Sequence, residues 1–390
     1  MLEPADVAVV GAGLFGTSIA YQLAVRGAGR VVLVEREQVC SGDSGVSFSM
    51  MRRHYSNEVV ARLALRGVEV IKAWPEEIGT GESGYVPTGY LLTVTPEHAE
   101  ALRANVERLR GWGVDTSVVE LAEIAEIEPL LMLDGIAAGA YEADGGFADS
   151  QKMTLSWFAA GVAAGVRPVL GTTVRSIAVS GGRVVGVETD RGTIACDTVV
   201  LATGSWGPAL ARTAGLDLPI VLRRLEVSFV RQPADEPQVR VTFSDMASNL
   251  VMRPDRAGIA WVVAYQPEVR YEQRDDCPRD VGPEYEQAVR RALRERVPDY
   301  ADAAWLGGFA GAYDYTPDWN PILGWAPGID GLYLALGWSG HGFKLAPSVG
   351  EVAADEVAGR PPAIDVAPLA LDRFERGALL RLAYGPGARA

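Results

Sequence analysis

The sequence predicts an α/β protein in which a domain with a parallel sheet is interleaved with a second domain that holds a mixed sheet. Short apolar runs that end in glycine turns occur near both ends of the chain and predict the parallel sheet. Alternating apolar and polar residues over 221–265, followed by a helical pattern over 283–296, predict the second sheet and a helix across it. The 390 residues are enough to form two modest cores.

Composition and charge exclude several classes of protein. The residues are 48% hydrophobic and 22% charged, which is typical of a folded globular chain. The formal net charge of −14 repels phosphate backbones and anionic lipids, so we expect neither a nucleic acid nor a membrane as partner. No apolar run is long enough to span a membrane and no leader pattern precedes the first strand, so we expect a cytoplasmic protein.

The cysteines give no sign of a disulfide framework. Cys40, Cys196 and Cys277 show no paired spacing, which suits a reducing compartment. They also form no CxxC pair, so the sequence predicts no structural zinc and no other metal site.

The N-terminal residues predict one strand–helix–strand unit. An apolar run over 7–10 is followed by helical spacing over 14–26 and by a second apolar run over 31–34. Gly27 and Gly29 lie between the helix and the second run, where they end the helix. A unit of this kind places its two strands in a parallel sheet.

A GxGxxG motif lies between this first strand and this helix. Gly11 allows a tight turn, Gly13 lets a pyrophosphate approach the backbone, and Gly16 lets the helix pack close to the strand. Glu35 ends the second strand, where a carboxylate can accept hydrogen bonds from ribose hydroxyls. The arrangement favours dinucleotide binding over a glycine turn in an unrelated sheet, but it does not separate FAD from NAD.

The rest of the chain shows further helical and strand patterns without an internal repeat or a low-complexity linker. We therefore expect two domains that are each built from separate stretches of chain. The patterns predict helices over 57–75, 97–109, 152–164 and 283–296 and from about 347, and strands over 90–94, 166–169, 173–179, 184–189, 197–202, 227–230, 249–252, 259–265 and 331–337.

Five segments together carry a more specific signal than any one motif. They read SGDSG at 41–45, MRRHY at 51–55, VVLATGSW at 199–206, YDYTPD at 313–318 and GWSGHGFK at 337–344. These segments resemble the D-amino-acid-oxidase-like superfamily of FAD-dependent oxidoreductases, especially its sarcosine oxidase and glycine oxidase branch. The resemblance extends over the whole chain at corresponding positions.

This resemblance implies a Rossmann-like (GR2-type) FAD-binding domain interleaved with a mixed-sheet α+β substrate domain. The expected FAD-binding domain takes residues 1–85, 145–215 and 305–390. The expected substrate-binding domain takes residues 86–144 and 216–304.

The resemblance also implies which residues hold FAD. The adenosine and pyrophosphate would lie along the glycine motif, and residues 340–344 would pass beneath the flavin ring. There a cation and a helix dipole can stabilise negative charge on the reduced cofactor. The cofactor-binding residues expected on this basis are Gly11, Gly13, Leu14, Phe15, Gly16, Glu35, Arg36, Ser41, Ser44, Val174, Ala202, Gly204, Trp206, Gly340, His341, Gly342, Phe343 and Lys344.

On the substrate side, the resemblance implies a grip on a carboxylate. Lys344 and Arg53 match a carboxylate-binding lysine and arginine, and Arg52 is adjacent. A solvated basic turn or a surface salt bridge is the alternative interpretation of the two arginines. Tyr313 matches an active-site tyrosine, with a packed core aromatic as the alternative, and His341 is placed near the flavin.

Two departures separate this sequence from the monomeric sarcosine oxidases. Those enzymes attach the flavin through a cysteine just before the tyrosine that Tyr313 matches, whereas residues 309–312 read FAGA, so we expect non-covalent FAD. They also place an oxygen-activating lysine on a strand that corresponds to residues 258–262, which read GIAWV. Without that lysine we expect slow reaction of the reduced flavin with oxygen.

The activity that the resemblance implies is that of an amine or amino-acid oxidase. Hydride would pass from the carbon next to a secondary or primary amine to the flavin, giving an imine, and reoxidation by oxygen would give hydrogen peroxide. The expected partners are a small, carboxylate-bearing amine or amino acid and oxygen or another electron acceptor. The alternatives are a dehydrogenase that passes electrons to a carrier or quinone, and a non-catalytic flavin-binding subunit.

Overall fold

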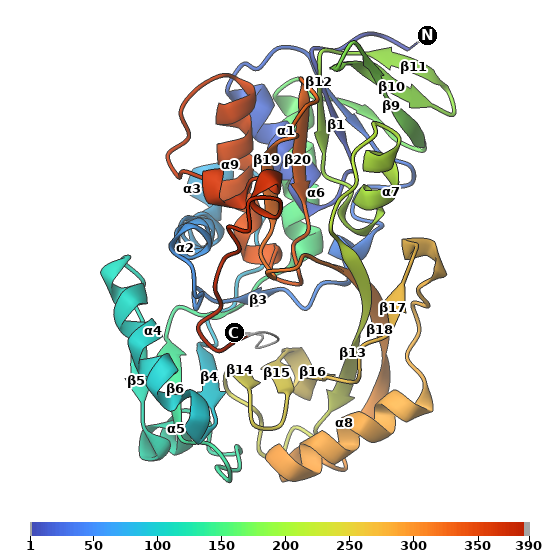
Figure 1. Ribbon diagram of the computed structural model, residues 1–390. Helices are drawn as coiled ribbons and strands as arrows, with labels where there is room; N and C mark the ends of the chain where they lie inside the picture. The colour runs from blue at the N-terminus through green and yellow to red at the C-terminus, as the bar shows by residue number, and fades with distance from the viewer. Residues whose placement is uncertain (1, 386–390) are drawn as a thin grey trace.

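A six-stranded sheet forms the core of the first domain (Figure 1). Its strands are β1 (Val7–Val10), β2 (Val31–Val34), β8 (Arg167–Val169), β12 (Thr198–Leu201), β19 (Ile322–Trp325) and β20 (Leu332–Leu336). In the computed structural model, which describes residues 2–385, their order is β19-β20-β12-β1-β2-β8. All neighbouring pairs are parallel except β19 and β20, which are antiparallel.

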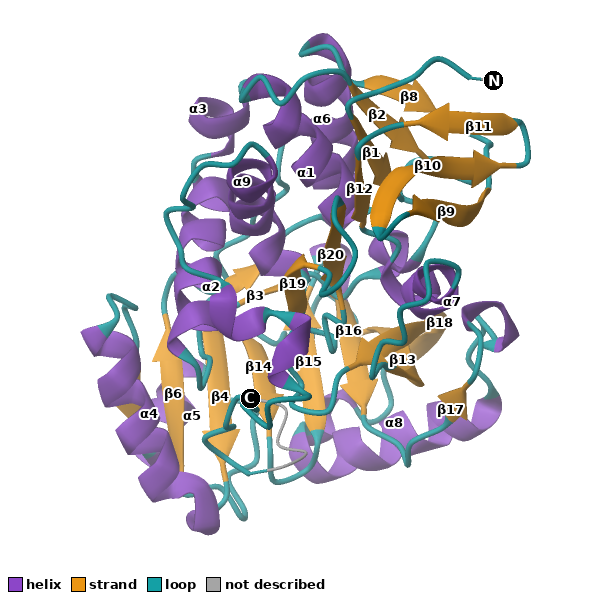
Figure 2. Ribbon diagram, turned by 45° about the horizontal axis from the view of Figure 1, so that its top comes forward, coloured by secondary structure: helices purple, strands orange, loops and turns teal. Residues whose placement is uncertain are grey.

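Helices cover one face of this sheet and a small antiparallel sheet covers the other (Figure 2). The helices on the first face are α1 (Leu14–Val25), α2 (Glu58–Lys72), α3 (Trp74–Ile78), α6 (Ser150–Ala163) and α9 (Ala346–Val357), whereas α7 (Gly207–Arg212) lies on the other face with the small sheet. The small sheet consists of β9 (Val174–Ser180), β10 (Arg183–Thr189) and β11 (Gly192–Ala195). Because both faces are buried, β1 and β2 are apolar at every position.

A nine-stranded mixed sheet forms the second domain (Figure 1). Its strands are β4 (Tyr90–Val94), β5 (Ser117–Val119), β6 (Ala138–Glu142), β13 (Val221–Arg231), β14 (Thr242–Asp245), β15 (Leu250–Pro254), β16 (Ile259–Ala264), β17 (Arg270–Tyr271) and β18 (Ala304–Tyr315). The order is β17-β13-β16-β15-β14-β4-β6-β5, and β18 also pairs with β13.

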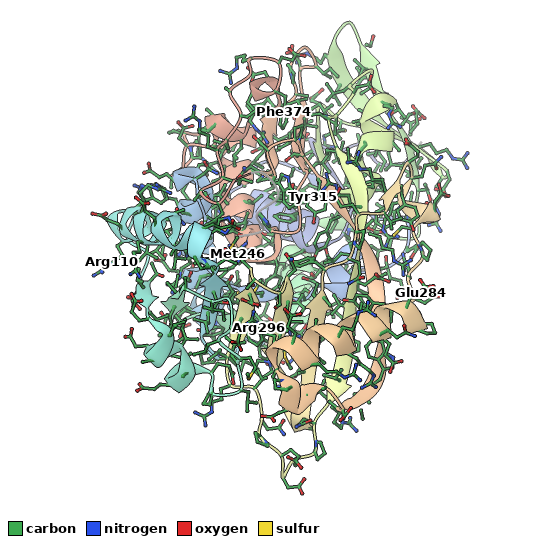
Figure 3. All side chains as sticks on the ribbon, turned by 60° about the horizontal axis from the view of Figure 1, so that its bottom comes forward. Arg110, Met246, Glu284, Arg296, Tyr315 and Phe374 are labelled. Atoms are coloured by element: carbon green, nitrogen blue, oxygen red, sulfur yellow. The ribbon has the colours of Figure 1, made fainter. Side chains whose placement is uncertain are left out.

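Three helices accompany this sheet: α4 (Ala99–Gly111), α5 (Leu121–Ile127) and α8 (Pro283–Arg296). Figure 3 shows α8, with Glu284 and Arg296 near its two ends, lying across the outer side of the sheet. Its apolar residues join the buried core formed by alternate residues of β15 and β16. The intervening strand residues, such as Val251 and Val263, point to the opposite face, which faces the first domain and leaves room for a site between the domains.

Strand β18 differs from the boundary expected near residue 305. Its residues pair with β13 from Tyr315 opposite Val221 to Ala304 opposite Arg231, so they belong to the nine-stranded sheet. Glycines within residues 304–315 weakened the strand pattern there, because glycine has low strand propensity. A short pairing of β3 (Met50–Met51) with β7 (Gly146–Phe147) lies between the domains. The expected division into five segments otherwise stays a prediction.

The expected fold class, an α/β protein with a Rossmann-like domain and a mixed-sheet domain, is confirmed. The helix expected over 283–296 is α8, with the same bounds. The helix expected over 57–75 ends at Lys72 and is followed by α3, because Pro75 has no N–H to continue the α2 hydrogen bonds. Among residues 2–385, no helix is both long enough and apolar enough to cross a membrane.

Candidate cofactor and substrate site

The three motif glycines are each required by a close contact. A side chain at Gly11 would lie 2.6 Å from the carbonyl oxygen of Ala202, and the Gly11 φ of +100° also favours glycine. A Cβ at Gly16 would lie 1.8 Å from the Gly11 carbonyl oxygen, so this glycine lets α1 pack against β1. A Cβ at Gly13 would lie 2.9 Å from Oγ of Ser44, which accepts a hydrogen bond from the Leu14 amide.

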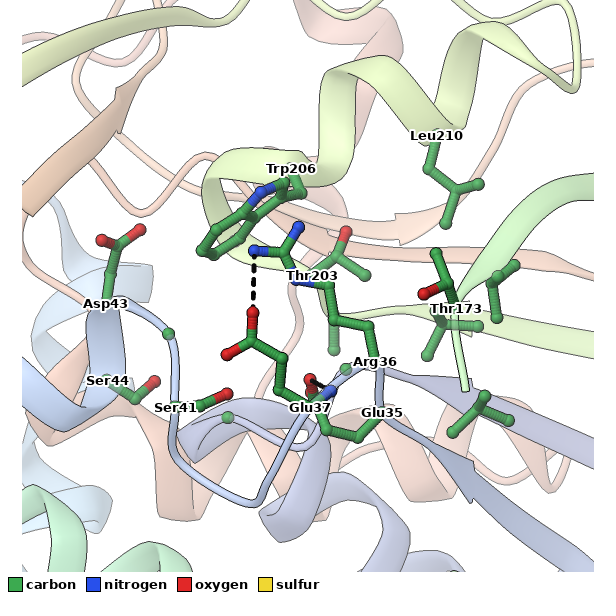
Figure 4. A pocket seen from close by; sticks show the side chains of 18 of the residues that line it. Glu35, Arg36, Glu37, Ser41, Asp43, Ser44, Thr173, Thr203, Trp206 and Leu210 are labelled. Atoms are coloured by element: carbon green, nitrogen blue, oxygen red, sulfur yellow. Dashed lines mark hydrogen bonds and ion pairs between the residues drawn. The ribbon is translucent and has the colours of Figure 1, made fainter. Parts of the chain in front are cut away.

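A first cavity of about 330 Å³ opens at the carboxyl ends of β1, β2 and β12 (Figure 4). The Glu35 carboxylate is fixed at its edge by hydrogen bonds from the amides of Ala12 (2.8 Å) and Glu37 (2.9 Å). The guanidinium of Arg36 lies 4.4 Å from the centroid of the Trp206 ring. The residues expected to bind the cofactor that line this cavity are Gly11, Gly13, Glu35, Arg36, Ser41, Ser44, Val174, Ala202, Gly204 and Trp206.

A second cavity of about 140 Å³ adjoins the first and shares Gly13, Asp43 and Ser44 with it. One wall comes from β18 of the second domain, and another holds the rings of Phe15 and Trp338, which stack with centroids 3.5 Å apart. Of the remaining residues expected to bind the cofactor, this cavity is lined by Leu14, Phe15, Gly340, Gly342 and Phe343.

The two glycines of the 340–342 segment lie against aromatic rings. A Cβ at Gly340 would lie 2.4 Å from the ring of Tyr313, and one at Gly342 would lie 2.7 Å from the ring of Phe15. Both rings line the second cavity. Side chains at these positions would therefore push the rings into the cavity or displace the loop.

Asp314 holds this loop in place and was not expected from the sequence. Its buried carboxylate accepts hydrogen bonds from the amides of Gly337 (2.8 Å) and Trp338 (3.1 Å). Burial raises the pKa of Asp314 to about 7. Asp314 lines the second cavity, so its state of ionisation acts on whatever this cavity binds.

A third cavity of about 70 Å³ adjoins the second on the far side and shares Tyr313, Gly340 and Phe343 with it. Arg52, His341 and Lys344 bring polar groups to it, as do the serines Ser47, Ser49, Ser244 and Ser339. Its other walls are mostly aromatic and apolar: Phe48, Met50, Leu225, Val251, Val263, Tyr265, Tyr313, Tyr315, Trp319 and Phe343. The three cavities form a series that ends in a small chamber, and Arg52 and Lys344 both line this chamber.

The Lys344 side chain in this chamber is buried, and its pKa is shifted as a result. It is 3% exposed, and its Nζ lies 5.6 Å from the centroid of the Tyr55 ring. Burial, together with the neighbouring positive charge of Arg52, holds the pKa of Lys344 well below its ordinary value. An anion placed in the chamber would restore the charged form of the lysine.

The structure separates the two adjacent arginines. Arg53 donates from Nε to Oε2 of Glu142 at 3.1 Å, and its backbone amide donates to the same carboxylate. Arg52 lines the third cavity, where it donates to the carbonyl oxygen of His54 and lies 4.5 Å from the Tyr55 ring. Lys344, Tyr313, His341 and Arg52 are therefore brought together, whereas the Arg53 guanidinium is directed at Glu142.

Several lining residues had no signal that marked them as functional. Tyr315 is two residues after Tyr313 in β18, so strand alternation places both on the cavity face once β18 is known as a strand. Tyr265 follows β16 and Trp319 lies in the loop after β18, and nothing local in the sequence links either to the chamber.

Known proteins match the chain over most of its length. A family model described as "DAO: FAD dependent oxidoreductase" matches residues 6–356. The sarcosine oxidase subunit beta of Rhodobacter capsulatus is 26% identical over 379 residues, which cover 95% of this chain and 89% of that protein. The glycine oxidase of Geobacillus kaustophilus is 29% identical over 376 residues, which cover 94% of this chain and 97% of that protein.

A solved structure agrees with these sequence matches. The L-proline dehydrogenase from P. horikoshii superposes with a TM-score of 0.88 at 27% identity, covering 97% of this chain and 100% of that chain. The family match includes the glycine motif, the cavity walls of β18 and the segment that holds Lys344. The chain belongs to the DAO family of FAD-dependent oxidoreductases.

Proposed function

We propose that the protein oxidises the carbon–nitrogen bond of a small amino acid, with FAD as the hydride acceptor. The observation that carries this proposal is the chamber in which Arg52 and Lys344 lie beside the second cavity. Bound FAD supplies an electron-deficient ring that takes up hydride, so the protein needs no covalent nucleophile.

The residues present fit FAD. The N-terminus of α1 and the motif glycines offer amide groups and space to a diphosphate, and Glu35 stands where ribose hydroxyls bind. The first cavity would hold the adenosine and the diphosphate, and the second, between Phe15 and Tyr313, would hold the flavin.

The substrate carboxylate would bind between Arg52 and Lys344. Hydrogen bonds between two ionised groups are stronger than neutral ones, and they gain strength where water is excluded. The aromatic walls of the chamber provide that exclusion. Sarcosine, glycine and proline, which give three of the relatives their names, each carry a carboxylate next to the amine-bearing carbon.

The same environment favours the form of the amine that can react. Hydride transfer from the α-carbon requires an unprotonated nitrogen, and burial disfavours the charged form of an amine. The pKa of Lys344 in the same chamber is lowered by burial and by the charge of Arg52, which supports this part of the proposal. The volume of about 70 Å³ favours amino acids with small side chains.

In the first form of this proposal, oxygen reoxidises the flavin and hydrogen peroxide is the product. The relatives include oxidases and a dehydrogenase, so in the second form a carrier protein or a quinone accepts the electrons. The second form is favoured by the absence of a lysine from residues 258–262, which correspond by resemblance to the strand that carries the oxygen-activating lysine of monomeric sarcosine oxidases. A non-catalytic flavin-binding subunit is the third alternative, but such a subunit would not need Arg52 and Lys344 in one chamber.

Anaerobic titration of the yellow holoprotein with a panel of amino acids tests the proposal. Glycine, sarcosine, proline and both enantiomers of alanine are suitable first members, and bleaching of the flavin absorbance reports reduction. We expect at least one of them to bleach the flavin fully. Full FAD occupancy with no bleaching by any amino acid would favour the non-catalytic subunit.

A further inference from the structure

Residues 274–279 lie in the connection between β17 and α8 of the second domain, yet they reach the first cavity of the FAD-binding domain or contact residues that line it. Arg279 lines this cavity together with Glu35 and Arg36. None of the residues in this connection was expected to take part in cofactor binding. Their contacts with the cavity wall are charged and specific.

Arg274 makes the deepest of these contacts. Its side chain is 3% exposed and donates to both carboxylate oxygens of Asp43, at 2.7 Å from Nη2 and at 2.9 and 3.2 Å from Nε. Asp43 lines both the first and the second cavity. The Arg274–Asp43 pair therefore lies at the junction of the spaces assigned to the adenosine diphosphate half and the flavin half of the cofactor.

Asp275 makes a second set of contacts at the cavity mouth. Its carboxylate accepts hydrogen bonds from Nε1 of Trp206 at 2.9 Å and from the guanidinium of Arg36 at 3.2 and 3.3 Å. Trp206 lies between two cations, with Arg36 at 4.4 Å and Arg274 at 5.2 Å from its ring centroid. Figure 4 shows Arg36 beneath the Trp206 ring, with Asp43, Ser41 and Ser44 beside it.

The connection is also fixed to the strand that forms the wall of the second cavity. The carbonyl oxygen of Arg279 accepts a hydrogen bond from the Ala310 amide at 2.7 Å, and Nη1 of Arg274 donates to the carbonyl oxygen of Cys277 at 3.3 Å. The amide of Ala312 lies 3.4 Å from Oδ1 of Asp43. Thus β18, Asp43 and the connection form one bonded assembly around the cavity junction.

We infer that residues 274–279 form a cofactor strap. In this role Arg279 supplies a cation to the diphosphate of FAD, and the Arg274–Asp43 and Asp275–Arg36 pairs keep the cavity closed over the cofactor. In this arrangement the strap and the Trp206 side chain stand between the bound cofactor and solvent. Release of FAD then requires both ion pairs to break. The inference rests on FAD binding by this family and not on the amino-acid oxidation proposed above.

The rate at which the holoprotein releases FAD tests the strap. Free FAD is more fluorescent than the bound form in most flavoproteins, so dilution of the holoprotein with an excess of a non-fluorescent competitor reports release directly. Arg274→Gln should accelerate release by about tenfold or more, since loss of one partner of a partly buried charge pair acts mainly on the dissociation rate. Asp275→Asn, at a mostly exposed pair, should accelerate it by about threefold.

Arg279→Ala tests the diphosphate contact separately. It should weaken FAD binding and reduce the dependence of that binding on salt concentration, while Arg279→Lys restores part of both. Arg270→Gln is the matched control, because Arg270 lies in β17, directly before the connection, and its ion pair with Glu268 (3.6 Å) is exposed and away from the cavity. We expect the control to release FAD at the native rate.

Circular dichroism separates loss of fold from loss of the strap. If Arg274→Gln does not fold, Asp275→Asn and Arg279→Ala carry the test, because their side chains are not in the buried core. Native release rates in the folded variants would overturn the inference. These measurements need no substrate, so their outcome does not depend on whether an amino acid reduces the flavin.

Discussion

The Nε atom of Arg53 lies 3.1 Å from Oε2 of Glu142 in an ion pair whose side chains are 6% and 1% exposed. This pair engages Nε of the arginine that had been expected to hold the substrate, while the buried Nη2 of Arg53 has no hydrogen-bond partner among the described residues. The pair leaves Arg52, the preceding residue, beside Lys344 in the third cavity. Arg52 and Arg53 therefore have different surroundings, and substitution of each should have a different measurable effect.

Arg52→Gln and Lys344→Met should each raise the KM for the substrate by about 10- to 150-fold, the effect of losing one charged hydrogen bond of roughly 1.5–3 kcal/mol. FAD occupancy, measured as flavin absorbance per protein, should stay full.

Arg53→Gln should instead lower the free energy of unfolding by about 3 kcal/mol or more, because it leaves Glu142 as an unpaired buried carboxylate. A larger effect of Arg53→Gln than of Arg52→Gln on KM, at equal stability, would contradict this assignment.

Asp314 should make the stability of the protein depend on pH. Its pKa in the folded state is raised from 3.8 to about 7, so the folded state holds a proton that the unfolded state has released between these values. The stabilisation from this group is complete below pH 3.8 and is lost as the pH rises towards 7, with a slope of about 1.4 kcal/mol per pH unit in the steepest range.

The comparison with Asp314→Asn isolates this contribution. Urea unfolding of both proteins from pH 4.5 to 8, at a fixed excess of FAD, should show the native protein losing stability relative to the variant as the pH rises to about 7. Above that pH the difference between the two should become constant. Parallel stability curves over the whole range would mean that Asp314 does not titrate in this window.

FAD should be released by acid precipitation. The cysteine through which monomeric sarcosine oxidases attach the flavin is absent from residues 309–312. Cys277 has its Sγ 3.9 Å from the Gly311 carbonyl oxygen but does not line the second cavity. We therefore expect the yellow chromophore in the supernatant and an unmodified protein mass. Flavin that stays with the pellet would point to a covalent bond, and Cys277→Ser would then show whether this thiol forms it.

Reoxidation of the reduced flavin by oxygen should be slow. Trp261 of β16 lies in the apolar cluster behind the third cavity, where its ring is 5.8 Å from that of Phe309. Trp261→Lys would place a cation on this face and should accelerate reoxidation, because a positive charge stabilises superoxide as it forms. A lysine at Ala260 would enter the core beneath α8 and should only destabilise the fold.

Stopped-flow mixing of reduced protein with oxygenated buffer measures this rate. Fast reoxidation in the native protein would show that another cation acts in place of the lysine. Arg253 is the first candidate, since its guanidinium lies 3.9 Å from the Trp261 ring centroid. Arg253→Met should then slow the reaction. Slow reoxidation with rapid turnover on an artificial acceptor would favour the dehydrogenase.

Much of the fold followed from local patterns, because the parallel sheet uses continuous apolar runs and glycine turns that are visible in short windows of sequence. The glycine motif and Glu35 were predicted for the same reason, since they lie inside a strand–helix–strand unit with its own signal, whereas Lys344 was predicted only from the resemblance of residues 337–344 to the family. Strand β18 was not found, because its glycines hide the alternation and its partner β13 precedes it by more than 70 positions.

The choice between Arg52 and Arg53 had no local signal. Adjacent residues of an extended segment point to opposite sides, so one of the two must face away from the chamber. Which one does so depends on Glu142, which is 89 positions away in β6. Arg274 and Asp43 are 231 positions apart, so their pairing was equally invisible in the sequence.

The claim that Arg52 and Lys344 grip a substrate carboxylate has one most direct measurement. The rate of anaerobic flavin reduction is compared for an amino acid that bleaches the flavin and for the same amine without its carboxylate, each over a range of concentrations. We predict that the amine lacking the carboxylate reduces the flavin at least about 100-fold less efficiently, since it leaves Arg52 as a buried cation without an anionic partner and removes the anion that would restore the charge of Lys344. Equal efficiency for the two compounds would contradict the account.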